Sequence, residues 1–464
     1  MKIAKNTTIF RVLFISTIII RICTSQTEVS GNITENTNWT VINSPYLVVG
    51  KVQLFPGAKL TIDPGVIVKF NEGQSIVIGG ELVCSGTVDD SIIFTANCSS
   101  PYPGYWGGIQ FIDSSRDAIF DKNGAYVSGS ILKYCVIEYG SNSINCVYSS
   151  PFICNSTLQN NSRSLILVYN NSVITFNTIK NNTHTGNGTG FYLLNSDPRI
   201  ENNSIKYNYA QGSGGAFYLE QSSPIINNNN IYNNQSSIGG GFFINSGSPI
   251  IRNNNIEENL SGAGSFTFIE YGSTPLIENN IIKNNHSSYG SSVEIVSGSP
   301  VIIYNNIEIA DKYFIEVYRG NENINALNNY WGYINADSIS NHIYDYYDDI
   351  TLSQILFIPF LTEQYVKTIN CSSNNIFSKY RLLKNYPNPF NSNTRISYQL
   401  PKTSFVILSI IDINGRLIKT LVSERQDAGN YSINWNSNNL SSGVYFYKID
   451  AGEFKSVKKC LLIK

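Results

Sequence analysis

Between residues 172 and 310 the chain repeats one pattern of apolar and polar positions. Six anchor positions lie 26, 26, 25, 26 and 25 residues apart. The anchors are Ser172, Pro198, Pro224, Pro249, Pro275 and Pro300. Two residues after each anchor stands an isoleucine: Ile174, Ile200, Ile226, Ile251, Ile277 and Ile302. Five residues after it stands an asparagine: Asn177, Asn203, Asn229, Asn254, Asn280 and Asn305. Seven residues after it isoleucine returns, at Ile179, Ile205, Ile231, Ile256, Ile282 and Ile307.

A repeat of this length predicts a solenoid, in which each repeat forms one coil. Helical repeats need ten or more consecutive helix formers, which this Asn- and Gly-rich text does not supply. Short strands fit better, because β-branched and aromatic residues alternate with turn residues, as in "GGGFFI" at residues 239–244. The fold class predicted is therefore all-β, with a β-solenoid.

The spacing of the two isoleucines places a corner between them. They are five positions apart, and in a straight strand an odd spacing would put them on opposite faces. A corner returns both to the interior. Asparagine tolerates the left-handed conformation, so we expect the asparagine five after the anchor to make the corner. Equivalent asparagines in stacked coils lie about 4.8 Å apart. We therefore expect their amides to form a hydrogen-bonded ladder.

Strand-like text extends in both directions from the repeat. Apolar residues alternate within 44–70 and recur in 76–96 and 105–111, and "NNYWG" at 328–332 precedes a Tyr- and Asp-rich segment. These segments resemble the first and closing coils of right-handed parallel β-helix proteins on bacterial surfaces. The right hand is what the resemblance implies; the spacing does not determine it.

The C-terminal text breaks the repeat and predicts a second, smaller domain. "SFVILSIIDINGRLIKTLV" at 404–422 has hairpin chemistry at Asn414 and Gly415. With 427–436 and 441–464 it predicts about seven short strands, which fits a small Ig-like sandwich. The blocks YPNPFN, INGR, LSSGVYFY and the basic tail stand in the order of the type A C-terminal sorting domain of the type IX secretion system, which this region resembles. The residues that carry the resemblance are Tyr386, Pro387, Asn388, Pro389, Phe390, Asn414, Gly415, Gly443, Lys459 and Lys464.

The N-terminus has the features of a secretory signal. Lys2, Lys5 and Arg11 precede the apolar run at 12–20, which is short for a bilayer span. We expect a signal peptide at 1–25, a β-helix at 26–365, a linker at 366–380 and the Ig-like sorting domain at 381–464. The resemblance implies a two-membrane bacterium of the Bacteroidetes type. The leader then crosses the inner membrane and the tail crosses the outer membrane through the type IX machinery, so the protein is secreted or displayed on the surface.

Composition excludes several partners. Only 14% of the 464 residues are charged and the formal net charge is -1, so we expect neither nucleic acid nor an anionic membrane as a partner. We expect no transmembrane segment once the leader is removed, and a monomer. The eight cysteines show no CxxC spacing, and we expect them mostly as buried apolar residues, with a Cys146–Cys154 disulfide as the alternative.

No catalytic, cofactor or metal site is predicted. The charges of the repeat are scattered: Asp197, Arg199, Glu201, Glu220, Arg252, Glu257, Glu258 and Glu294. The histidines, His184, His286 and His342, are expected on surface turns, because a metal needs three or four converging ligands. The acidic "DYYDD" at 345–349 is expected as a solvated cap, with a cation site as the alternative. Trp39, Trp106 and Trp331 are expected in the core or caps, with sugar-stacking platforms as the alternative.

Three functions follow from this organisation. The leading one is a non-catalytic protein that binds or adheres to glycans or other surfaces. The alternative is a polysaccharide lyase or glycoside hydrolase, which should show two carboxylates within about 10 Å of each other in a groove. Periplasmic metal delivery, suggested by similar text in copper-related β-helix proteins, is disfavoured by the sorting tail and by the single methionine.

Overall fold

The computed structural model describes residues 26–308, 311–320, 322–365, 380–383, 385, 388–400, 404–426, 429–437, 440–452 and 454–464. The expected signal peptide, most of the linker, Tyr386, Pro387 and Cys371 lie outside the described residues. The chain forms two compact units, residues 1–367 and 368–464. The first unit is a right-handed parallel β-solenoid, so the predicted all-β solenoid is confirmed.

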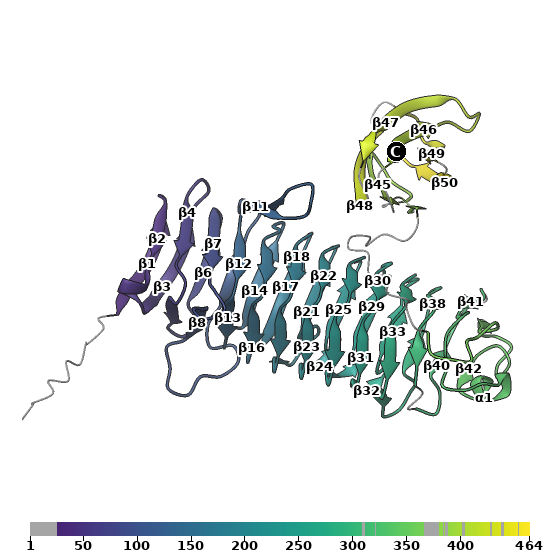
Figure 1. Cartoon of the computed structure of the whole chain (residues 1–464), viewed down its shortest axis with the longest axis horizontal. Coiled ribbons are helices and arrows are strands. Elements are labelled where there is room, and N and C mark those ends of the chain that lie inside the picture. Colours follow the sequence, from purple (N-terminus) through teal and green to yellow (C-terminus); the bar gives the residue numbers. More distant parts are fainter. Residues whose placement is uncertain are drawn as a thin grey trace, which may run out of the picture. The chain divides into compact units, whose positions relative to one another are not determined.

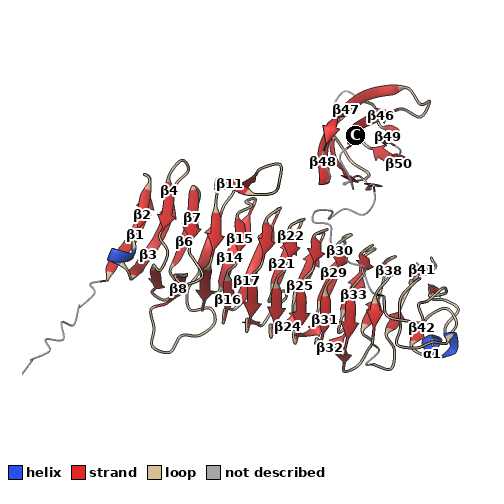
Figure 2. Cartoon of the chain, in the orientation of Figure 1, coloured by secondary structure: helices blue, strands red, loops and turns tan. Residues whose placement is uncertain are grey.

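Each coil of the solenoid contributes strands to three faces (Figures 1 and 2). The first face is a sheet of 13 strands: β2 (Thr37–Trp39), β4 (Lys59–Ile62), β7 (Glu81–Ser85), β12 (Ile131–Lys133), β15 (Phe152–Cys154), β18 (Val173–Thr175), β22 (Arg199–Glu201), β26 (Ile225–Asn227), β30 (Ile250–Arg252), β34 (Leu276–Glu278), β38 (Val301–Ile303), β41 (Ile324–Asn325) and β43 (Ile355–Leu356). The second face comprises β5 (Ile67–Phe70), β8 (Ile92–Ala96), β13 (Cys135–Glu138), β16 (Thr157–Gln159), β19 (Thr178–Lys180), β23 (Ser204–Lys206), β27 (Asn230–Tyr232), β31 (Asn255–Glu257), β35 (Ile281–Lys283) and β39 (Asn306–Ile307).

The third face comprises β6 (Ser75–Ile78), β9 (Gly108–Phe111), β14 (Asn142–Val147), β17 (Arg163–Val168), β21 (Phe191–Leu194), β25 (Phe217–Glu220), β29 (Phe242–Asn245), β33 (Thr267–Glu270), β37 (Val293–Ile295), β40 (Ile315–Val317) and β42 (Ile343–Tyr344). The second and third faces meet at the N-terminal end through β1 (Thr27–Ile33) and the long strand β3 (Tyr46–Leu54), which pairs with both β5 and β6. A hairpin of β10 (Ile119–Phe120) and β11 (Tyr126–Ser128) projects from the coils, and the short helices are η1 (Val41–Asn43) and α1 (Ala336–Ser340).

After Phe176 the coils of the solenoid become longer. Left-handed corner residues at 134, 155 and 176 lie 21 apart, and from 176 to 202 the step becomes 26. The extra residues form a five-stranded sheet between the second corner and the third face. Its strands are β20 (Thr183–His184), β24 (Tyr209–Ser213), β28 (Gln235–Ile238), β32 (Leu260–Ala263) and β36 (His286–Ser287). We call this five-stranded sheet the ridge. Its first strand, β20, and its last strand, β36, form its two edges.

The core is built from columns of identical or similar side chains. The isoleucines two and seven after each anchor are all buried and stack in register, as in the pairing of Ile231 with Ile256. Phe191, Phe217 and Phe242 form a second column, with ring centroids 4.8 and 4.9 Å apart. Trp39, Trp106 and Trp331 are buried as well, which places them in the core and excludes them as sugar platforms.

Every non-glycine residue of the described chain with positive φ lies in one of three corner columns. The first column is Tyr134, Asn155, Phe176, Asn202, Asn228, Asn253, Asn279, Tyr304 and Asn328. The second is Tyr139, Asn160, Asn181, Tyr207, Asn233, Glu258 and Asn284. The third is Tyr148, Tyr169, Asn195, Gln221, Ser246 and Tyr271. The left-handed residue is thus four after the anchor. The expectation that Asn229 and its equivalents, five after the anchor, adopt positive φ is wrong by one position.

The residue after each corner points inward and bonds to the next coil. In the first corner Asn177, Asn203, Asn229, Asn254, Asn280 and Asn305 are buried, and each amide Nδ2 donates to the next Oδ1 at 3.0 Å. The last acceptor is Asn329, from the "NNYWG" segment. A parallel ladder at the second corner runs from Asn161 through Asn182, Asn208, Asn234 and Asn259 to Asn285, with amide distances of 2.9–3.1 Å.

The second unit is a small antiparallel sandwich. One sheet contains β44 (Arg381–Leu382), β45 (Asn393–Leu400) and β48 (Gly429–Asn436); the other contains β46 (Ser404–Ile411), β47 (Leu417–Gln426), β49 (Gly443–Ala451) and β50 (Phe454–Leu462). Asn414 and Gly415 lie in the turn between β46 and β47, where Gly415 has φ +78. The Asn388 side chain accepts the Leu461 N–H at 2.8 Å, and Phe390 packs on Trp435 with ring centroids 5.2 Å apart. Lys459 lies in β50, and the Lys464 N–H donates to Ser442 at 2.9 Å.

The cysteines of the solenoid are free thiols. Cys84, Cys135, Cys146 and Cys154 are buried and Cys98 is exposed. Cys146 and Cys154 therefore do not form the alternative disulfide in this structure. Cys460, in the second unit, is a buried free thiol as well.

We expect Ile231→Asn to lower the free energy of unfolding by about 2–5 kcal/mol, through lost burial and an unpaired amide. Ile231 is fully buried, whereas Ile281, in the same second face, is 46% exposed. Ile281→Asn is therefore a matched control that should stay within about 0.5 kcal/mol of wild type. Denaturant unfolding measures both changes, and equal effects would contradict the inward assignment of Ile231.

We expect glycine to separate the two roles at the corner. Asn228→Gly should be tolerated, because glycine adopts positive φ without cost, whereas valine there should cost about 1–2 kcal/mol. Asn229→Gly should cost several times more, because the Asn229 side chain donates to Ile200, Asn227 and Asn254 and accepts from Asn203. Thermal melting of these three single variants tests this. Greater loss for Asn228→Gly than for Asn229→Gly would contradict it.

Candidate functional site

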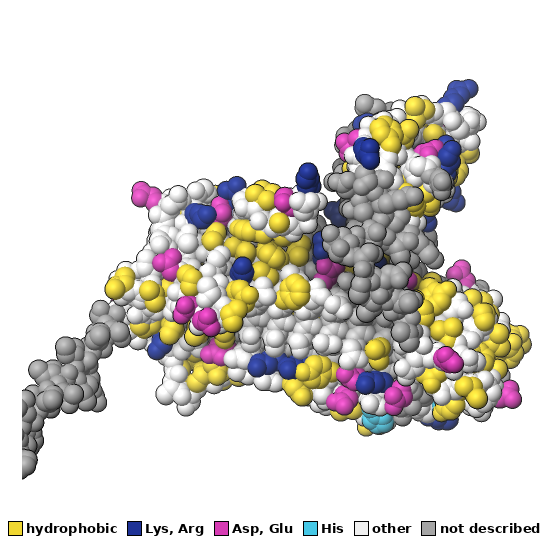
Figure 3. Space-filling model, in the orientation of Figure 1, with side chains coloured by type: hydrophobic (Ala, Val, Ile, Leu, Met, Phe, Trp, Pro, Cys, Tyr) yellow, Lys and Arg dark blue, Asp and Glu magenta, His cyan; other side chains and the backbone are white. Residues whose placement is uncertain are grey.

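An open groove follows the first corner across five coils. It has a volume of about 820 Å³ and is lined by Phe176, Asn202, Asn228, Asn253, Asn279, Ile281, Asn306 and Tyr365, together with their ladder neighbours and other uncharged side chains. We call it the amide groove. In Figure 3 a pale band without coloured side chains crosses the middle of the visible face of the first unit, between the first and second faces of the solenoid. None of the described residues that line the groove carries a charge.

The amides of the groove have defined orientations. Corner residues in the left-handed conformation point outward, and Asn202 and Asn228 are hydrogen-bonded to each other through their side chains. Asn253 Nδ2 donates to Asn227 Oδ1 at 2.7 Å. Because each side-chain amide has two donor hydrogens and two acceptor lone pairs, it can bond to a neighbour and to a ligand at the same time. The result is a fixed array of donors and acceptors that repeats about every 4.8 Å, the spacing of stacked strands.

Aromatic side chains stand at both ends of the amide groove. Phe176 is 59% exposed at the N-terminal end. At the other end Tyr365 packs on Tyr304 with ring centroids 5.5 Å apart. The Asn306 side chain holds the Tyr365 backbone there, accepting its N–H at 2.6 Å and donating to its carbonyl at 2.9 Å. A side-chain amide of this groove thus already binds polar groups of an extended chain.

Two glutamates, Glu294 and Glu316, lie side by side. Sequence analysis placed Glu294 among scattered charges and did not consider Glu316. Glu294 in β37 pairs in register with Glu316 in β40, and both interact with the Tyr318 hydroxyl. Glu294 also accepts from the backbone N–H of Gly264 at 3.1 Å and of Ser291 at 3.3 Å. Burial raises the pKa of both carboxyls. The pair can hold a proton at a higher pH than free glutamates. It does not line the amide groove.

The sequence around the two glutamates indicates strands, but it does not follow the repeat. Both glutamates sit between apolar strand residues, in "SVEIV" and "FIEV". The second follows after the 26-residue period has broken down, so alignment on the anchors could not bring it beside the first.

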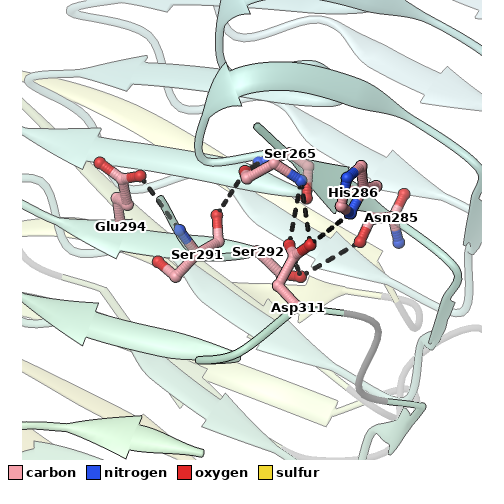
Figure 4. A network of polar contacts seen from close by, with 8 residues as sticks. Ser265, Asn285, His286, Ser291, Ser292, Glu294 and Asp311 are labelled. Carbon is pink, nitrogen blue, oxygen red and sulfur yellow. Dashed lines mark hydrogen bonds and ion pairs between the residues drawn. The ribbon is translucent and has the colours of Figure 1, made fainter. Parts of the chain in front are cut away.

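A polar network next to the pair involves His286 (Figure 4). Its Nδ1 lies 2.7 Å from the buried Asp311 carboxylate, while its own side chain is 61% exposed. Asp311 also accepts from the Ser287 N–H at 3.1 Å and the Ser292 hydroxyl at 3.0 Å. Asp311 therefore caps the C-terminal edge of the ridge, and His286 lies at the surface as expected.

His184 and His342 make more contacts than a solvated surface turn provides. His184 is half-buried, with Nδ1 3.0 Å from the Ser162 hydroxyl. Burial and the adjacent Arg163 cation lower its pKa to about 4. His342 stacks on Tyr333, and its Nδ1 lies 2.8 Å from the Lys312 carbonyl. The expected surface-turn placement is therefore wrong for His184, which lies in β20, whereas His342 lies in a turn as expected.

The remaining sequence candidates are structural. Asp345, in the "DYYDD" segment, is 4% exposed and accepts the Ile355 N–H at 2.7 Å and the Tyr347 N–H at 3.1 Å. Asp345 organises the closing turn from a buried position, whereas residues 346–349 of the segment are exposed, as expected of a solvated cap. Within the described ranges, no group of three or more His, Cys, Asp or Glu side chains is placed to hold a metal. Arg199 is paired with Glu201 at 2.7 Å, and Glu257 with Lys283 at 3.0 Å.

Comparisons with known proteins agree with this architecture. The family described as "Right handed beta helix region" matches residues 142–330, and "Pectate-lyase like beta helix domain" matches 31–146. "Secretion system C-terminal sorting domain" matches 384–464. The chain is therefore a right-handed parallel β-helix protein that ends in a type IX secretion sorting domain. It is secreted or located on the outer cell surface, and the secretion machinery is a partner. No helix of the described part is long and apolar enough to cross a bilayer.

Similarity to individual proteins is limited. No curated protein matches the chain significantly. Among solved structures, the enzymatically active domain of tailspike protein 4 from bacteriophage CBA120 is 12% identical, with a TM-score of 0.25. The match covers 87% of this chain and 64% of that domain. At this level of similarity the tailspike carries no argument about ligand or activity.

We expect His184 to make stability depend on pH in a defined window. Its folded pKa of about 4 lies below the unfolded value of about 6.5, so only the unfolded chain gains a proton in between. The contribution of His184 is complete above about pH 6.5 and decreases as pH falls toward 4. His184→Gln should therefore lose less stability than wild type between pH 7 and pH 4. If the stabilities of wild type and His184→Gln change equally with pH over that window, the lowered pKa of His184 is contradicted.

Proposed function

We propose that this secreted β-helix protein binds an extended, uncharged polysaccharide chain along the amide groove without cleaving it. The observation that carries the proposal is the column of four outward corner amides, Asn202, Asn228, Asn253 and Asn279, which lies between the exposed Phe176 and the half-buried Tyr365. The sorting domain places the protein outside the cell, where such polymers are available.

The chemistry of the groove suits a sugar polymer. Hydroxyl groups both donate and accept hydrogen bonds, and so do asparagine side chains. The apolar faces of sugar rings pack on aromatic side chains, which Phe176 and Tyr365 offer at the ends of the groove. The described lining residues are all uncharged, which favours a neutral chain over an acidic one.

The solenoid also holds the groove in its binding conformation. Each corner amide is followed by a buried ladder asparagine whose side chain is hydrogen-bonded to adjacent coils, as at Asn229. Little conformational entropy is therefore lost when a chain binds, which favours affinity at a shallow surface.

A second candidate function is cleavage of a polysaccharide, and the observation that favours it is the Glu294–Glu316 pair. Glycoside hydrolysis uses two carboxyl groups, one of them with a raised pKa. Glu294 is 3% exposed, however, and the pair stands apart from the groove. Non-catalytic binding is therefore the better supported function.

We expect removal of groove amides to weaken binding to a neutral glucan or mannan by about 10-fold or more, since each hydrogen bond contributes about 0.5–1.5 kcal/mol. The test variant is Asn228→Gly with Asn279→Gly, because glycine preserves both left-handed corners. The matched control is Asn181→Gly with Asn233→Gly, which makes the same change at the second corner. A neutral glycan array followed by affinity electrophoresis measures the effect.

Two outcomes would contradict the proposal. One is equal affinity of the groove variant, the control and wild type. The other is release of reducing sugar by wild type that is lost in Glu294→Gln, which would establish the hydrolase function instead.

A further inference from the structure

The N-terminal edge of the ridge holds a half-buried arginine that none of the described carboxylates neutralises. Arg163, the first residue of β17, sits where coil length changes from 21 to 26 residues. Its guanidinium lies over the Tyr192 ring, 5.1 Å from the centroid, and its Nε donates to the Asn187 carbonyl at 3.0 Å. Within the described part of the chain it forms no ion pair.

Other arginines of the solenoid show the usual arrangement. Arg116 and Arg199 are more exposed, and each contacts a glutamate, at 2.9 and 2.7 Å respectively. A partly buried cation normally has an anionic partner, because removal of water from an unpaired charge is costly. Burial lowers the pKa of Arg163, which reflects this cost. Burial of Arg163 therefore has a desolvation cost that none of the described carboxylates offsets.

The groups around Arg163 are also donors. Ser162 and His184 form a hydrogen bond of 3.0 Å, and His184 is neutral near pH 7. When the Ser162 hydroxyl donates to Nδ1, the histidine proton is on Nε2. A Cβ built on Gly186 would lie 2.8 Å from that Nε2 and 3.3 Å from Arg163 Nη2. Glycine at this position leaves the space between the two nitrogens open.

We propose that Arg163 Nη2 and His184 Nε2, on either side of Gly186, form a binding site for an anionic oxygen group, a sulfate or carboxylate, either free or attached to a polysaccharide. The planar guanidinium, fixed by Tyr192 and Asn187, presents its remaining N–H groups to two oxygens at once. This site follows the second corner and the amide groove follows the first, so neither depends on the other.

The alternative explanation is that Arg163 only covers the end of the ridge and binds no ligand. On that reading the cation stacks on the exposed Tyr192 face and satisfies the Asn187 carbonyl, and its charge has no function. The two readings differ in one measurable property. A cover contributes to melting temperature, whereas a binding site contributes to the preference for anionic over neutral ligands.

The experiment compares dextran sulfate, carboxymethyl dextran and unsubstituted dextran, which share one backbone, with sodium sulfate as the free anion at constant ionic strength. Isothermal titration calorimetry of the mature protein should show at least 10-fold tighter binding to a charged dextran than to dextran. Arg163→Gln should remove that preference, and Arg163→Lys should restore part of it. The matched control is Arg319→Gln, which removes an exposed positive charge and should leave the preference within twofold of wild type.

Gly186→Ala provides a second, independent variant, because it retains the arginine and fills the space beside it. It should reduce the preference for charged dextran while the charge of Arg163 is retained. The inference is overturned if wild type neither binds sodium sulfate nor distinguishes charged from neutral dextran, or if Arg163→Gln and Gly186→Ala both bind as wild type does. Equal losses in Arg319→Gln would show a non-specific charge effect and overturn it too.

The outcomes also separate this site from the amide groove. Sulfate binding that Arg163→Gln abolishes, without tighter binding to dextran sulfate, supports the site and assigns it to free anions. Binding of neutral glycans that is lost in the Asn228→Gly and Asn279→Gly variant but retained in Arg163→Gln concerns the groove alone. Failure of either function therefore leaves the other testable.

Discussion

The hydrogen bond from one ladder asparagine to the next is the interaction on which the remaining architecture depends. Each coil turns three corners, and a left-handed residue at a corner leaves backbone groups facing the interior. At the first two corners the following asparagine satisfies them: Asn229, for example, bonds to two carbonyls of its surroundings and to Asn254 in the next coil. Buried polar groups are costly when unpaired, so a coil without this residue would open at its corner. The isoleucine columns supply burial, and the ladders hold successive coils in register.

The ladders explain why the proposed ligand-binding features lie outside the core columns. Inside the solenoid, the side chains of the ladder asparagines are hydrogen-bonded to adjacent coils. Outside, the preceding left-handed residue is free to vary, and the chain uses Asn, Tyr, Phe, Gln, Ser and Glu there. The amide groove is therefore a by-product of corner geometry that a ligand can use. The ridge is different, because five added residues per coil create edges, and each edge is covered by charged groups: Arg163 at one end, Asp311 and the glutamate pair at the other. Covered edges also prevent strand-to-strand association with other chains.

Much of this could be predicted from the sequence, because one period fixes the neighbours of every residue within it. The spacing of Ile174 and Ile179 and their equivalents was enough to place a corner and two inward columns, and the β-helix and sorting domain were recognised from short blocks. The position of the left-handed residue was missed by one, since asparagine occupies both Asn228 and Asn229 and only the structure shows which points inward. The coils in which the preceding residue is Phe176 or Tyr304 contained the answer, because a buried ladder position would not accept those rings.

The residues whose contacts the sequence did not predict lie where the repeat length changes. Arg163 precedes the first long coil, and Glu316 follows the last regular one, so neither has an equivalent in the repeat with which it could be aligned. Their partners are set by stacking across coils of unequal length: Arg163 meets Tyr192, and Glu316 meets Glu294. In a solenoid, contacts between adjacent coils follow from the repeat only while coil length is constant. Irregular coils are also the places where a side chain loses its identical neighbour above or below, and a charge left unpaired there is available to a ligand. Sites of recognition on such a scaffold are therefore expected first at its changes of coil length.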